Sequence, residues 1–157
     1  MLYSEKLTTD IDGLNRRRNK VLESLDAAKR RLAELQDLQT YTNNKYKNFD
    51  EVQRDRQRAV WRIQQSGLRS RTVESYGDMM NIQANQEPYE NVVSGFQESL
   101  HAIHNEIIKA ELEIQEYGRQ ISLINDDIKI YEQKRQVALT DERIDRERAE
   151  ARRNGDW

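Results

Sequence analysis

The chain of 157 residues has no cysteine, one proline and six glycines. Without cysteine it forms no disulfide, no thiolate metal site and no cysteine nucleophile. A sheet-rich fold needs turn residues about every ten positions, which this content cannot supply. No apolar stretch approaches the roughly 20 residues of a membrane span, and no apolar leader core follows residues 1–4. We therefore expect an all-α cytoplasmic protein, with export without a cleaved leader left open.

Charged residues make up 34% of the chain, apolar residues only 36%, and the mean hydropathy is −1.04. Such a composition cannot fill a thick core. We therefore expect residues 1–157 to form a single elongated helical domain.

Apolar residues recur with alternating spacings of three and four in two ladders. They occupy 7, 11, 14, 21, 25, 28, 32 and 35, then 93, 96, 100, 103, 107, 110, 114, 117, 121, 124, 128 and 131. This period predicts two helices with coiled-coil seams. In the heptad abcdefg, Ile11 and Val93 are a positions, whereas Leu7 and Phe96 are d positions. Arg18 interrupts the first ladder at an a position, as a register device or a defect whose stem can lie along the seam.

The expected boundaries follow from where the ladders lapse. The first long helix should cover 3–42. A second long helix should cover 88–138, with Pro88 in its first turn, where a missing N–H costs nothing. Its seam fails at Arg135, and the alternating charges beyond it predict a frayed, charged tail over 139–157.

The middle segment, 43–87, should hold short helices. Asn48 with Glu51 three residues later resembles a capping box that opens one of them, and 66–67 (Ser-Gly) resembles its stop. A weaker helix could follow over 73–82. The two ladders then pair as an antiparallel helical hairpin with these short helices near its tip.

Four large apolar side chains of the second helix fall off its seam, at b, f and c positions. A two-helix hairpin would leave them in water, whereas a partner helix could bury them. We therefore predict that they form an interface with a protein partner. They are Ile108, Leu112, Leu123 and Ile130.

Residues able to carry chemistry are few. His101 and His104 are spaced i, i+3 but match no strong metal motif. The acidic residues lie mostly outside the seams, where solvated helix charges are expected, and there is no phosphate-binding loop or nucleophile elbow. We expect no enzyme activity, no metal and no cofactor.

Charge is segregated along the chain. Residues 45–71 carry eight Lys/Arg against three acids, whereas 72–132 carry three against twelve. Opposite signs favour folding back or docking a complementary partner. The basic stretch from Arg54 to Arg62 should be a solvated face paired with acids of the last helix. Nucleic-acid binding through residues 54–71 is the less favoured alternative.

The layout of two long helices, with Trp61 followed by Ser66-Gly67 and a second ladder ending at Tyr131, resembles the small helical helper proteins of LXG toxins in bacterial type VII secretion, relatives of the WXG proteins. The resemblance covers roughly residues 3–135. It implies that the chain binds a toxin's LXG domain, together with a second small helper, in a side-by-side bundle presented to the secretion ATPase. Trp61 and Gly67 would be the positions for secretion recognition.

The sequence therefore favours a non-enzymatic adaptor or targeting chaperone that binds a partner's helical domain. A self-assembling structural coiled-coil subunit is the first alternative, because a sustained seam alone cannot choose between self and non-self pairing. A nucleic-acid-binding helical protein is the second.

Overall fold

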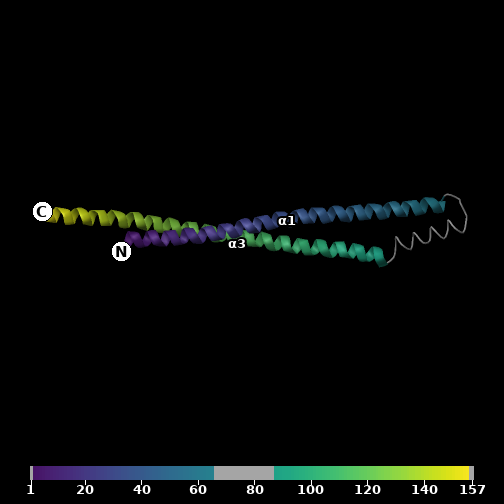
Figure 1. Cartoon of the computed structure of the whole chain (residues 1–157), viewed down its shortest axis with the longest axis horizontal. Coiled ribbons are helices and arrows are strands. Elements are labelled where there is room, and N and C mark those ends of the chain that lie inside the picture. Colours follow the sequence, from purple (N-terminus) through teal and green to yellow (C-terminus); the bar gives the residue numbers. More distant parts are fainter. Residues whose placement is uncertain (1, 66–86, 156–157) are drawn as a thin grey trace. The chain divides into compact units, whose positions relative to one another are not determined.

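The computed structural model describes residues 2–65 and 87–155 (Figure 1). Helix α1 spans Tyr3–Gln65 and helix α3 spans Glu87–Arg153, and these described residues contain no strand. The two helices pack antiparallel as a hairpin, because Ser4 near the start of α1 contacts Glu142 near the end of α3. The predicted all-α helical hairpin is confirmed.

The predicted break after residue 42 is wrong, because α1 continues without interruption to Gln65. The predicted boundary between 3–42 and 43–87 therefore falls inside one helix. Asn48 also lies inside this helix, so it is not an N-cap. The heptad register of the first ladder also continues unbroken, but its seam becomes polar and aromatic. The a and d positions from 39 onward are Gln39, Thr42, Tyr46, Phe49, Gln53, Arg56, Val60 and Ile63.

The later part of α1 keeps its helical form through local chemistry. It contains no proline, and it is supported by ion pairs one turn apart, Arg54 with Asp50 at 3.1 Å and Arg58 with Asp55 at 3.6 Å. The predicted Ser-Gly stop at 66–67 and the weaker helix over 73–82 lie outside the described residues.

Helix α3 begins one residue before Pro88, so the predicted placement of this proline in the first turn is confirmed. The predicted end at residue 138 is wrong, because the helix continues through most of the segment 139–157 to Arg153. Gly155 then adopts a left-handed φ of 72°, and the N–H of Asn154 donates to the carbonyl oxygen of Glu150 over 2.9 Å. A left-handed glycine just past the last turn is a common helix terminator.

Packing divides the chain into two units. The first unit combines residues 1–30 with 111–157, and the second unit comprises residues 31–110. In the first unit, the best-buried side chains form an apolar seam between α1 and α3. Ile11, Ile124 and Ile128 are 4%, 3% and 6% exposed, and they are flanked by Leu14, Val21 and Tyr131.

The seam of the first unit extends further than the sequence predicts. Ala138, the d residue after Arg135, is buried, as is Ser4. The Ser4 hydroxyl donates to Glu142 Oε2 over 2.6 Å, and the Ser4 N–H donates to Glu142 Oε1 over 3.1 Å. A polar contact between helices therefore replaces the apolar ladder at this end, and α3 continues past the N-terminal end of α1 (Figure 1).

Arg18 at its a position is partly buried. Its guanidinium donates to Asn125 Oδ1 on α3 and to Asn15 Oδ1 on α1, both over 2.9 Å. The contact with Asn125 joins the two helices at one height, which supports the interpretation of Arg18 as a register device.

The second unit holds its helices together with aromatic side chains. The Phe49 ring lies 5.6 Å from Tyr89 and 6.0 Å from Phe96, and Tyr46 lies 5.4 Å from Phe96. Tyr46 comes from the part of α1 that was expected to be a break, and Phe49 from the short helix expected after it, so the hairpin extends through both.

Candidate helix-binding surfaces

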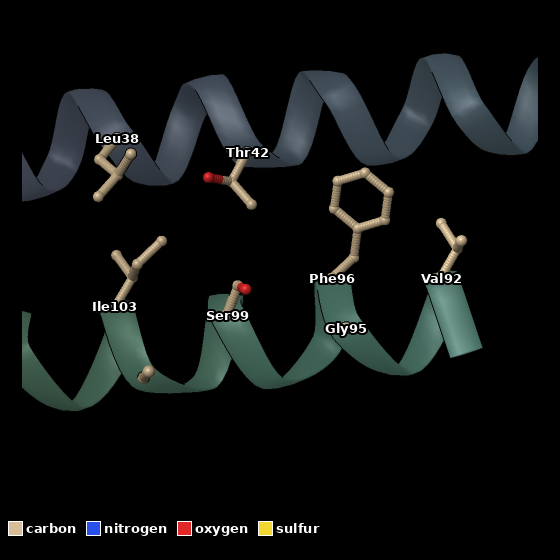
Figure 2. Close-up of a pocket in the computed structure, with 8 residues that line it drawn as sticks. Leu38, Thr42, Val92, Gly95, Phe96, Ser99 and Ile103 are labelled. Atoms are coloured by element: carbon tan, nitrogen blue, oxygen red, sulfur yellow. The ribbon is translucent and has the colours of Figure 1, made fainter. Parts of the chain in front are cut away.

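An apolar groove of about 660 Å³ lies between α1 and α3 in the second unit. Figure 2 shows Leu38 and Thr42 of α1 on one side, facing Phe96, Ser99 and Ile103 of α3. The lining is mostly apolar, and its residues are Leu38, Thr42, Val92, Gly95, Phe96, Ser99, Ala102 and Ile103.

The groove exists because several of its positions carry small side chains. Gly95, Ser99 and Ala102 follow one another at spacings of four and three on α3, so they share one side of the helix. A Cβ atom added at Gly95 would meet nothing within 4 Å. Leu38 and Val92 at the rim are 46% and 40% exposed. The hairpin therefore leaves this apolar concavity unfilled.

Polar groups lie near the groove. An ion pair between Arg31 and Glu106 crosses from α1 to α3 within the same unit. Lys45 places its Nζ 5.4 Å from the centre of the Tyr41 ring, which is 60% exposed. The apolar surface is thus accompanied by charged groups, an arrangement typical of protein-binding sites.

The four predicted interface residues are all exposed. Leu123 and Ile130, in the first unit, are 50% and 49% exposed and are both c positions; Leu112, also in the first unit, is 59% exposed at an f position. Ile108 belongs to the second unit and is 42% exposed. Their placement off the seam agrees with the heptad assignment, and their use by a partner stays a prediction.

Sequence reasoning missed one further member of this surface, Val137, which is 63% exposed. It follows Leu123 and Ile130 at the same spacing of seven, so the period alone could have identified it. Beside Ile130 and Val137 lies a second concavity of about 440 Å³, which Tyr3 of α1 also lines.

Of the two candidate residues for secretion recognition, the structure describes Trp61 but not Gly67. Trp61 is 62% exposed at a b position of α1, so its indole is available to a partner. Gly67 lies outside the described residues.

The basic stretch is paired differently from the prediction. Arg54 and Arg58 contact Asp50 and Asp55 of α1 itself, so acids of the last helix are not their partners among the described residues. Local neutralisation also lowers the charge that a nucleic acid would meet.

Few other groups suggest chemistry. His101 and His104 are exposed on α3, and residues 2–65 and 87–155 contain no cluster of three or more side chains suited to hold a metal ion. Within the same residues, neither helix is long and apolar enough to cross a membrane.

Two glutamates, Glu116 and Glu142, have a lowered pKa because they accept hydrogen bonds within or between the helices. The pKa of Glu116 is lowered to about 2 because Arg119 and Gln120, one turn away, donate hydrogen bonds to it. The pKa of Glu142 is lowered mainly by the Ser4 hydroxyl and then by the Ser4 backbone N–H. Both shifts favour the ionised carboxylate, which suits a structural contact.

Comparison with known proteins returns no likeness: no family model matches the chain, and no curated protein and no solved structure matches it.

Proposed function

We propose that the protein is a non-enzymatic adaptor that binds a helix of another protein in the groove of the second unit. The observation that carries this proposal is the unfilled apolar groove with small residues on its α3 side and exposed Leu38 and Val92 at its rim. Small residues let a helix backbone approach closely, and large apolar side chains of that helix would gain from leaving water.

The resemblance to helper proteins of LXG toxins supplies the partner in this proposal. An LXG domain is helical, so it would offer a ridge of side chains spaced by three and four to such a groove. Binding would hold the toxin domain in a bundle of helices for export, and exposed Trp61 would be available to the secretion machinery.

The test is binding of the full chain to an LXG domain encoded beside it, measured by isothermal titration calorimetry. Gly95→Trp fills the groove and should weaken binding at least tenfold. Gly118→Trp is the matched control, because Gly118 is also a helical glycine of α3 with open space around its Cβ position, but it lies in the other unit. Both variants should keep the helical circular dichroism of the wild type.

Two results would contradict the proposal. If the LXG domain does not bind the wild type, the partner is wrong. If Gly95→Trp binds as tightly as Gly118→Trp, the groove is not the docking surface.

A further inference from the structure

Helix α3 carries a second apolar line in the first unit, on the side away from its own seam. We call it the outer ladder, and it consists of the successive c positions Leu123, Ile130, Val137, Ile144 and Ala151. The first three are about half exposed or more, and the other two are partly exposed. The ladder is about 42 Å long at 1.5 Å per residue, and its period of seven is that of a coiled-coil contact.

The g positions beside the outer ladder alternate in charge. In chain order they are Asp127, Lys134, Asp141 and Arg148. All four are exposed, and none forms an ion pair with another described residue. Lys134 contacts only the ring of Tyr131, with its Nζ 5.4 Å from the ring centre.

This alternation distinguishes two ways of pairing two copies of α3. A parallel pair would place the g residues of one copy against the f residues of the other. Lys134 and Asp141 would then face the neutral Gln133 and Thr140, and the repulsion between Asp127 and Asp126 would offset the attraction between Arg148 and Glu147. An antiparallel pair with its two-fold axis at Val137 brings Asp127 against Arg148 and Lys134 against Asp141 of the other copy. Each contact occurs twice, so the edge forms four ion pairs.

The same two-fold axis also brings the apolar residues of the two outer ladders into contact with one another. It pairs every ladder position with another: Val137 with Val137, Ile130 with Ile144, and Leu123 with Ala151. Moving the axis one heptad back, to Ile130, keeps charges complementary near the axis but places Ile144 against Glu116. Moving it one heptad forward places Leu123 and Ile130 opposite positions beyond Arg153, where α3 of the other copy ends. One antiparallel register therefore matches both charge and hydrophobicity.

The opposite edge of such a pair adds little attraction. Its central f positions, Gln133 and Thr140, are neutral. At each end Asp126 would face Glu147, which already contacts Arg143 of its own helix at 3.8 Å. Specificity would thus come from the g edge and the outer ladder.

We propose that the outer ladder is a dimerisation surface on which α3 of a second copy packs antiparallel, with the two-fold axis at Val137. The inference is independent of the groove in the second unit and of the partner proposed above. It makes the protein a two-fold adaptor in which each copy retains its own groove.

The absence of cysteine allows a direct test of the register. Val137→Cys should form a disulfide-linked dimer under mild oxidation, because a residue on the two-fold axis meets itself within disulfide range. Ile130→Cys alone should not cross-link, whereas a mixture of Ile130→Cys and Ile144→Cys should give the mixed dimer. Self-linking of Ile130→Cys at the rate of Val137→Cys would indicate a parallel pair and overturn the proposal.

A charge swap tests the contacts without covalent chemistry. Asp141→Lys should raise the dimer dissociation constant at least tenfold in sedimentation equilibrium, because Lys134 would then face a lysine. Adding Lys134→Asp should restore dimerisation, because an aspartate at position 134 would then face the lysine at position 141. If Asp141→Lys only destabilised the fold of each copy, the second substitution would not restore the dimer. Gly95→Trp should leave the dimer unchanged, so this assay separates the present proposal from the groove.

Two outcomes would refute the inference. A wild-type chain that sediments as a monomer throughout the micromolar range has no such surface. A double variant that stays as weak as Asp141→Lys shows that Lys134 and Asp141 do not meet, even if the chain dimerises elsewhere.

Discussion

Replacement of Ile124 by alanine tests the seam of the first unit. Ile124 is 3% exposed and packs with Ile11 and Ile128. The substitution removes three carbon atoms, worth about 2.4 kcal/mol at roughly 0.8 kcal/mol per buried methylene group. The cavity left behind adds to this loss, so the free energy of unfolding should fall by about 2–4 kcal/mol. Urea denaturation followed by circular dichroism measures the change.

Ile108→Ala is the matched control for this prediction. Ile108 lies on the same helix but is 42% exposed, and alanine has the higher helix propensity. Its free energy of unfolding should change by less than about 0.5 kcal/mol. If the two variants lose the same stability, the assignment of inner and outer positions on α3 is wrong.

Three further predictions concern polar groups on the seam. Arg18→Leu should raise the free energy of unfolding in urea by about 1 kcal/mol, because leucine is an apolar residue at an a position and Asn125, once it loses the arginine, can bond to water. A lower free energy of unfolding would show that the contact between Arg18 and Asn125 stabilises the hairpin. Gln53→Leu should raise the free energy of unfolding by about 1–2 kcal/mol, because the buried Gln53 Oε1 has no hydrogen-bond partner among the described residues. An unchanged free energy of unfolding would contradict this prediction. The folded pKa of Glu142 lies below its ordinary value of 4.5, so its stabilising contact with Ser4 should be complete above that value and lost as pH falls through the folded pKa. Ser4→Ala should make the thermal midpoint fall less between pH 6 and pH 3 than it does in the wild type, and an equal fall would refute the linkage.

The two apolar ladders allowed the hairpin to be predicted from the sequence. A period of three and four, interrupted only at Arg18, fixes which side of each helix is buried, so Ile11, Ile124 and Ile128 could be assigned to the interior in advance. Exposure of Leu123 and Ile130 followed from the same period.

The helix ends could not be predicted from the same pattern. Beyond residue 38 the seam of α1 carries Thr42, Tyr46 and Gln53, and a hydrophobicity pattern treats such residues as a lapse. The structure shows that aromatic contacts such as Tyr46 with Phe96 continue the seam. Near the end of α3, the hydrophobicity pattern did not identify Ala138 as buried. Ala138 follows the charged Arg135, and a small residue contributes little to a periodic hydrophobic signal.

The unbroken register of α1 restricts how this protein can change length. Inserting or deleting one residue in an α-helix turns everything beyond it by about 100°, which would move Val60 and Phe49 off the buried side. Seven residues complete about two turns, so whole heptads can be removed with little rotation. Because the helices run antiparallel, a shortened α1 needs an equal deletion in α3. Homologous chains should therefore differ in hairpin length by matched multiples of seven.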